Sequence, residues 1–210
     1  MPGTFLVLEG PEGSGKSTQA RRLAEVLRQD GWSVVVTREP GGTAIGEQIR
    51  RVLLDPGNCA MLAETEALLI SAARAQHVAE VIRPALAEGN IVVCDRYVDS
   101  TLAYQGGGRG LAIEPLLAVQ RFATGGLAPD RRVLLDLPVE VGLERRLKGA
   151  GEVNRLDLAE LSFHHRVRET YLRLAAEDPA GWSVVEADRP ADEVARRVYE
   201  TVLPLLPPRS

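Results

Sequence analysis

This chain has few cysteines and no long apolar run. By number and spacing, its two cysteines, Cys59 and Cys94, suggest neither a disulfide framework nor a zinc site, so a reducing cytoplasm fits best. No apolar run approaches the roughly 18 residues that a membrane-spanning helix needs. The formal net charge of -4 argues against a dedicated nucleic-acid binder, which usually has a strongly basic surface. We therefore expect a cytoplasmic protein whose partners include neither a membrane nor a nucleic acid.

Five short apolar runs, rich in β-branched residues, alternate with segments of helical periodicity. Strands are predicted at about 4–9, 33–37, 90–95, 131–137 and 182–187. Helices are predicted at about 16–29, 43–54, 63–88, 113–124, 138–148, 157–177 and 190–203. Because continuous apolar strands indicate a parallel sheet buried on both faces, the expected fold is α/β, with three layers and a five-stranded parallel sheet flanked by helices. The length of 210 residues predicts a single domain over 1–210.

A phosphate-binding loop is predicted by one continuous motif, Gly10-Pro11-Glu12-Gly13-Ser14-Gly15-Lys16-Ser17. The motif follows an apolar strand and opens a helix, where backbone N–H groups and the helix N-terminus favour an anion. Lys16 can reach the β- and γ-phosphates of a nucleotide, and the Ser17 hydroxyl can bind Mg²⁺. Asp95, which ends the strand at 90–95, is a second candidate for holding the metal. The alternatives are a tight strand–helix turn for the loop and a simple strand cap for Asp95.

Three classes of protein use such a loop, and the sequence disfavours two of them. A GTPase needs an Asn-Lys-x-Asp element to recognise guanine, but neither of the two lysines, Lys16 and Lys148, follows an asparagine. ATPases that act on DNA or protein usually need a longer chain and more basic surface. The remaining class is a small-molecule kinase, which needs a second anion site for its acceptor.

Further segments carry a resemblance to a known family. They are Glu9 to Thr18, Thr37-Arg38-Glu39-Pro40-Gly41-Gly42-Thr43, Asp95-Arg96-Tyr97, Ser100, Tyr104-Gln105-Gly106-Gly107-Gly108-Arg109, Asp130 to Asp136 and Asn154-Arg155-Leu156-Asp157. In this order and over nearly the whole chain, the sequence resembles bacterial thymidylate kinases. The resemblance implies a P-loop kinase fold, a homodimer, and transfer of the γ-phosphoryl group from ATP to dTMP with Mg²⁺.

The resemblance also implies roles for the charged residues. Gly10 to Thr18 would bind ATP, with Lys16 also catalytic. Arg96 would bind the dTMP phosphate and bridge it towards ATP, and Arg50 would bind the same phosphate. Glu12 would organise the acceptor and take part in catalysis, and Glu39 would orient neighbouring arginines. Arg50 could equally lie on a solvated helix face, and Glu12 could be only a helix-dipole partner.

The thymidine pocket is expected to be lined by Arg74, Ser100, Thr101, Tyr104 and Gln105, with Arg74 against the base. Ile70 stands where the family usually has an aromatic residue to stack on thymine, so base affinity or selectivity is expected to differ. Arg74 could otherwise be solvated, and Tyr104 could be a core residue.

A mobile lid is expected at about 148–157. Some thymidylate kinases carry a catalytic arginine inside the P-loop, but here that position is Gly13. The resemblance is therefore to the class that supplies the arginine from the lid, where Arg155 is the one candidate and Arg145 and Arg146 come just before. We expect Arg155→Ala to lower turnover by about 10²-fold or more with little change in dTMP affinity.

The sequence leaves two alternatives to this function. One is a related nucleoside-monophosphate kinase that prefers another base. The other is a nucleotide-binding protein that has lost catalysis. Formation of ADP that depends on the acceptor would separate both from the main interpretation.

Overall fold

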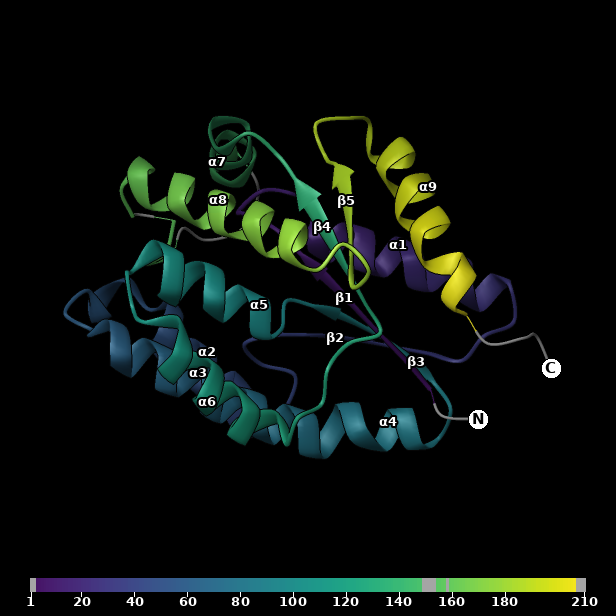
Figure 1. The fold of residues 1–210 in the computed structure, drawn as a ribbon, viewed down its shortest axis with the longest axis horizontal. Coiled ribbons are helices and arrows are strands. Elements are labelled where there is room, and N and C mark those ends of the chain that lie inside the picture. Colours follow the sequence, from purple (N-terminus) through teal and green to yellow (C-terminus); the bar gives the residue numbers. More distant parts are fainter. Residues whose placement is uncertain (1–2, 149–153, 158, 207–210) are drawn as a thin grey trace.

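A five-stranded parallel sheet forms the centre of the molecule (Figure 1). The computed structural model describes residues 3–148, 154–157 and 159–206. The strands are β1 (Thr4–Glu9), β2 (Val34–Arg38), β3 (Ile91–Asp95), β4 (Arg131–Asp136) and β5 (Trp182–Glu186), in the order β2-β3-β1-β4-β5. The five predicted strands are confirmed, and no strand end differs by more than one residue. The predicted α/β fold, with a five-stranded parallel sheet flanked by helices, is therefore confirmed as well.

Nine α-helices and four 3₁₀- or π-helical segments are present in the described ranges. The α-helices are α1 (Lys16–Gln29), α2 (Ala44–Leu54), α3 (Ala63–His77), α4 (Arg83–Ala87), α5 (Val98–Thr101), α6 (Ile113–Thr124), α7 (Val139–Lys148), α8 (Leu161–Glu177) and α9 (Ala191–Val202). The 3₁₀- and π-helical segments are η1 (Pro56–Asn58), η2 (Val78–Ile82), η3 (Leu102–Gly108) and η4 (Leu203–Leu205). The long helix predicted at 63–88 is divided, because η2 is a π-helical turn between α3 and α4. None of the helices in these ranges is both long and apolar enough to cross a membrane.

The helical stretch formed by α5 and η3 was not among the helices predicted from the sequence. Glycine has a low helix propensity, yet the glycines at 106–108 belong to a π-helical segment that packs against α8. A Cβ atom at Gly107 would lie 2.0 Å from the Thr170 hydroxyl, and one at Gly108 would lie 2.4 Å from the Phe163 ring. These glycines therefore allow η3 and α8 to approach closely. By helix propensity alone, the same glycines indicate a loop.

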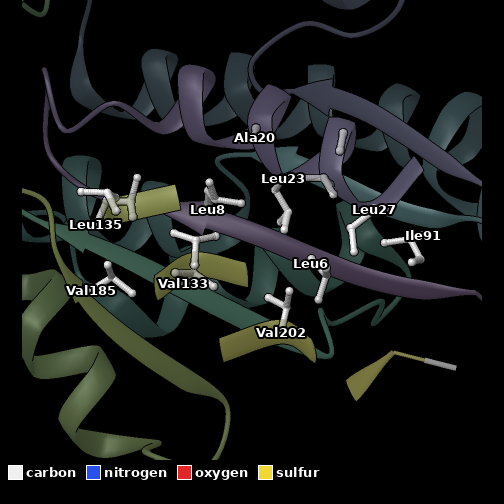
Figure 2. Packing of buried hydrophobic residues seen from close by; sticks show 14 of the residues in the cluster. Leu6, Leu8, Ala20, Leu23, Leu27, Ile91, Val133, Leu135, Val185 and Val202 are labelled. Atoms are coloured by element: carbon white, nitrogen blue, oxygen red, sulfur yellow. The ribbon is translucent and has the colours of Figure 1, made fainter. Parts of the chain in front are cut away.

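Alternate residues of the central strand face opposite sides of the sheet. Leu6 and Leu8 pack with α1 and α9 on one side, where Leu27 and Val198 are fully buried (Figure 2). Phe5 and Val7 face the other side, in a cluster with η2 and α4. Both faces of β1 are thus covered, so its carboxyl end is the point where this buried strand leaves the core for the phosphate loop.

Candidate functional site

A cavity of about 440 Å³ lies at the carboxyl ends of β1 and β3. Its wall joins the phosphate loop to residues from α2, α3, α5, η3 and the segment around 154–156. The predicted site residues that line it are Glu12, Gly13, Gly15, Lys16, Ser17, Thr18, Glu39, Arg50, Ile70, Arg74, Asp95, Arg96, Ser100, Thr101, Tyr104 and Gln105. The structure therefore brings the predicted phosphate loop and the predicted acceptor residues into one cavity.

Some lining residues were not assigned to the site from sequence. These are Arg38, Pro40, Leu54, Arg145, Arg146, Asn154 and Leu156. Three predicted members of the ATP site, Gly10, Pro11 and Ser14, lie in the loop but do not line the cavity. The loop motif predicted those three as members of the site, whereas nothing in the sequence predicted that Leu54 would line the cavity.

Backbone geometry explains the glycines of the loop. Gly13 has φ +70° and Gly15 has φ +89°, values that side chains other than glycine rarely adopt. A Cβ at Gly13 would lie 1.9 Å from the carbonyl oxygen of Gly142 in α7, while a Cβ at Gly15 would meet nothing within 4 Å. The position that carries an arginine in some thymidylate kinases is thus closed here by backbone atoms.

Lys16 is the first residue of α1 and lies over the loop. Its Nζ donates to the Pro11 carbonyl at 2.8 Å and to the Ser14 hydroxyl at 3.2 Å. Burial, and then repulsion from Arg96, lower the pKa of Lys16 to about 8. A polyanion bound between Lys16 and Arg96 would relieve this repulsion, so the site is electrostatically suited to phosphate groups.

The two residues predicted to bind the metal, Ser17 and Asp95, are in direct contact. The Ser17 hydroxyl donates to Asp95 Oδ2, which brings the start of α1 against the end of β3. No group of three or more His, Cys, Asp or Glu side chains in the described residues could hold a metal. The two oxygens still fit Mg²⁺, which commonly binds one or two protein ligands and takes the rest from phosphate and water.

Arg96 is the centre of the acceptor side. It has φ 73°, the positive value that only Arg96 shows among the non-glycine residues described. Its guanidinium donates to Glu12 Oε1 at 2.9 Å, to the Tyr104 hydroxyl at 2.8 Å and to the Gly10 carbonyl at 3.1 Å. Such strained backbone is often found at functional sites, and here it turns the side chain back over the phosphate loop.

Glu12 holds Arg96 in this orientation. Burial favours the neutral acid, but the charges of Arg96 and Lys16 outweigh it and lower the pKa of Glu12 to about 2. Glu12 also accepts from the Tyr104 hydroxyl at 3.0 Å. The carboxylate inside the phosphate loop is therefore ionised and offsets part of the positive charge between the two expected phosphate sites.

A second carboxylate, Glu9, lies beneath Arg96 and received no role from sequence. It is fully buried, and its Oε2 accepts from the Ser100 hydroxyl at 2.6 Å and from the Tyr171 hydroxyl at 3.0 Å. Burial, and then the charge of Asp99, raise the pKa of Glu9 to about 7. Its position at the end of β1 was visible in the sequence, but its contacts with Ser100 and Tyr171 were not.

Arg74 is fixed by the protein on almost every side. Its Nε donates to Glu39 Oε2 at 2.6 Å, and its Nη2 donates to the Tyr97 carbonyl at 2.7 Å. Its Nη1 donates to Thr101 and Gln120. These bonds use four of its five N–H groups within the described part of the chain. Arg74 is buried rather than solvated, and it forms part of the cavity wall.

Arg50 and Ile70 also line the cavity. Arg50 Nη1 donates to the Pro40 carbonyl at 2.8 Å, and burial together with Arg38 lowers the pKa of Arg50. A bound phosphate would again oppose this shift. Ile70 lines the cavity as an apolar side chain in place of an aromatic ring.

The structure separates Arg155 from the other predicted catalytic residues. Arg155 is buried, its Nε donates to the Leu53 carbonyl at 3.1 Å, and its Nη2 forms an ion pair with Glu66. It does not line the cavity, whereas Arg145 and Arg146 do. From the sequence, we expected this segment to be a lid whose arginine points into the cavity. Nothing in the sequence indicated that Glu66 would be the buried partner of Arg155. Residues 149–153 of the expected lid lie outside the described residues.

The chain is similar to known proteins over most of its length. The family model described as "Thymidylate kinase" matches residues 8–198. The chain is 57% identical over 198 residues to the thymidylate kinase of Thermomicrobium roseum, covering 94% of this chain and 93% of that one. It is 50% identical over 206 residues to the thymidylate kinase of Pseudomonas fluorescens strain Pf0-1, covering 98% and 97% of the two chains. For the thymidylate kinase of Ectopseudomonas mendocina the identity is 49% over 206 residues, with the same coverage.

Proposed function

Because the chain belongs to the thymidylate kinase family, we propose that it transfers the γ-phosphoryl group of ATP to dTMP, forming dTDP and ADP. The observation that carries this proposal is the single cavity whose wall contains both Lys16 and Ser17 of the phosphate loop and Arg74 and Arg96 of the acceptor side. A transfer between two nucleotides requires that both phosphate groups meet in one enclosed space.

In this reaction the donor phosphates lie on the loop amides and Lys16. A phosphate oxygen of dTMP attacks the γ-phosphorus, the bond from that phosphorus to the β-γ bridging oxygen breaks, and ADP leaves. Arg50 and Arg96 hold the attacking phosphate, and Glu12 keeps Arg96 oriented between the two nucleotides. Positioning and charge stabilisation are the main demands of phosphoryl transfer, and these residues supply both.

Mg²⁺ would be held by the Ser17 hydroxyl and the Asp95 carboxylate. When bound, it would neutralise charge on the donor phosphates. The hydrogen bond between Ser17 and Asp95 supports the assignment, because it shows that the two oxygens lie close enough to share one ion.

We propose Arg146 in place of Arg155 as the arginine that stabilises the transferred group. Arg146 lines the cavity, and its guanidinium is oriented by the buried carboxylate of Asp157, with Nη2 and Oδ2 at 2.9 Å. Arg155 is instead held by Glu66 outside the lining. The sequence predicted an arginine from the lid, and Arg146 lies in α7, which leads into that segment.

A homodimer that uses the face formed by α2, α3 and α6 is also part of the proposal. These helices lie side by side at one edge of the molecule (Figure 1). Each presents an apolar residue to solvent, namely Ile45, Leu68 and Phe122, and Phe122 is 91% exposed. Burial of a phenylalanine against a second copy of the chain is favourable by about 2 kcal/mol. In sedimentation experiments Phe122→Asp should give a monomer, while Leu203→Asp, an exposed leucine elsewhere, should not.

The compartment proposed for this reaction is the cytoplasm, where an exposed thiol such as Cys59 stays reduced.

The test of the proposed function is ADP release from MgATP with dTMP, dUMP, dCMP, dGMP and AMP offered separately. Strong preference for dTMP is expected and would show that Ile70 can replace an aromatic platform. Equal use of dUMP would keep the kinase and contradict the assigned selectivity. No release that depends on an acceptor, from folded protein that binds ATP, would overturn the proposal.

A further inference from the structure

The buried carboxylate of Glu66 accepts hydrogen bonds from three side chains that belong to two separate segments. Glu66 lies in α3 and is 1% exposed. Its Oε1 accepts from Gln105 Nε2 of η3 at 2.6 Å, and its Oε2 accepts from Arg109 Nη2 at 3.3 Å and from Arg155 Nη2. No part of the mechanism above uses Glu66, although Gln105 belongs to the cavity wall.

Glu66 is held in its charged form. Burial favours the neutral acid, but hydrogen bonds from Gln105 and Arg155 and the charges of Arg109 and Arg155 lower the pKa of Glu66 below its ordinary value. An ionised carboxylate accepts hydrogen bonds and donates none. Each group packed against Glu66 must therefore turn a donor towards it.

This requirement fixes the side-chain amide of Gln105. Its NH₂ group has to face Glu66, so its Oε1 points elsewhere. Gln105 is 1% exposed, and its Oε1 is buried without a hydrogen-bond partner in residues 3–148, 154–157 and 159–206. A buried acceptor without a partner is unfavourable, so this atom favours a ligand that brings an N–H group to it.

We propose that Glu66 is a positioning residue for base specificity, which turns the Gln105 amide so that its oxygen, rather than its NH₂ group, is offered to the base of the acceptor nucleotide. The inference rests on the proposed function, because it concerns the base of dTMP. Thymine and uracil carry an N–H group at N3, whereas cytosine has an acceptor there. An acceptor at residue 105 therefore favours dTMP over dCMP and does not distinguish dTMP from dUMP.

The first variant is Glu66→Gln, in which residue 66 can donate as well as accept. The Gln105 amide can then turn either face to the base. We expect the ratio of kcat/KM for dTMP to that for dCMP to fall by about tenfold or more. The loss should appear in KM and in the dissociation constant of dTMP rather than in kcat. Glu64→Gln makes the same change at an exposed residue of the same helix and should leave the ratio unchanged.

Two further variants separate positioning from general damage to the fold. Glu66→Asp keeps a carboxylate that only accepts, so it should retain more of the preference for dTMP than Glu66→Gln does. Gln105→Met removes the amide, so it should lower the ratio by itself. In that background, Glu66→Gln should change the ratio no further, whereas a merely structural role for Glu66 would give additive losses.

Measuring the dissociation constants of dTMP and dCMP as well as turnover distinguishes failure of the proposed function from failure of the role proposed for Glu66. If the wild-type protein binds neither nucleotide and releases no ADP with either, the proposed function fails. If the wild-type protein prefers dTMP and folded Glu66→Gln shows the same preference, the role of Glu66 is refuted and the function stands. Additive losses in the Gln105→Met background would also refute it.

Discussion

Replacement of Arg74 by methionine tests how far the acceptor pocket depends on a buried ion pair. The guanidinium of Arg74 and the carboxylate of Glu39 are almost completely buried and lie 2.6 Å apart. In Arg74→Met, the one side chain in the described structure that still pairs with Glu39 is the imidazole of His77, whose Nδ1 lies 2.9 Å from Glu39 Oε1. Removal of one partner leaves a buried charge uncompensated, which costs about 3–5 kcal/mol. For a chain of this size, each kcal/mol lowers the melting temperature by about 2–4 °C, so a loss of about 6–20 °C is expected.

Equilibrium unfolding in urea, followed by circular dichroism and by tryptophan fluorescence, measures this loss. In the double variant Arg74→Met/Glu39→Gln the unpaired charge is gone, so part of the stability should return. Arg173→Met is the matched control, because Arg173 forms an exposed ion pair with Glu177 one helical turn away. That change should cost about 0.5 kcal/mol or less. A loss below about 1 kcal/mol for Arg74→Met would refute the reasoning.

Three other substitutions test separate parts of the site. Because the pKa of Glu9 is higher in the folded protein than in the unfolded chain, the unfolded chain loses the Glu9 proton at a lower pH than the folded protein does. The free energy of unfolding should therefore fall as pH rises from about 4.5 to about 7. In Glu9→Gln this decrease in the free energy of unfolding should be smaller by up to about 3 kcal/mol. If the free energy of unfolding depended on pH in the same way in the variant and the wild type, the raised pKa of Glu9 would be contradicted. Gly13→Ala should raise the dissociation constant of MgATP by about tenfold or more, because its Cβ meets the Gly142 carbonyl. Gly15→Ala should raise the dissociation constant of MgATP by less. Equal increases in the two variants would show that the positive φ alone, and not the contact with Gly142, causes the loss of affinity. Arg146→Ala should lower kcat by about 10²-fold with little change in the KM for dTMP. If only Arg155→Ala has that effect, the assignment returns to Arg155.

The strands and the phosphate loop could be predicted because their signals are local. Apolar runs such as Arg132-Val133-Leu134-Leu135 identify a strand buried on both faces, and the glycine spacing from Gly10 to Gly15 identifies the turn that follows β1. The resemblance then supplied the acceptor side, and the structure places those residues around the same cavity.

What could not be predicted depends on partners that are distant in the sequence. Arg155 was predicted to be the catalytic arginine of the lid, and only the fold brings it to Glu66, which lies 89 positions away. The π-helical segment η3 was missed because its glycines are explained by contacts with α8 and not by their own propensity. Glu9 is a further case, since its contacts with Ser100 and Tyr171 require the sheet and α8 to be assembled.

The contact between Gly13 and Gly142 has a consequence for the paths open to this sequence in evolution. The obstruction at Gly13 is a backbone carbonyl, so no substitution at position 142 can remove it. An arginine in the phosphate loop would need α7 to shift as a whole, which a point mutation does not achieve. The same helix carries Arg145 and Arg146 on the cavity wall. Helix α7 thus excludes an arginine at position 13 and itself provides Arg145 and Arg146. A change from one arrangement to the other requires a rearrangement of the backbone and not only a single substitution.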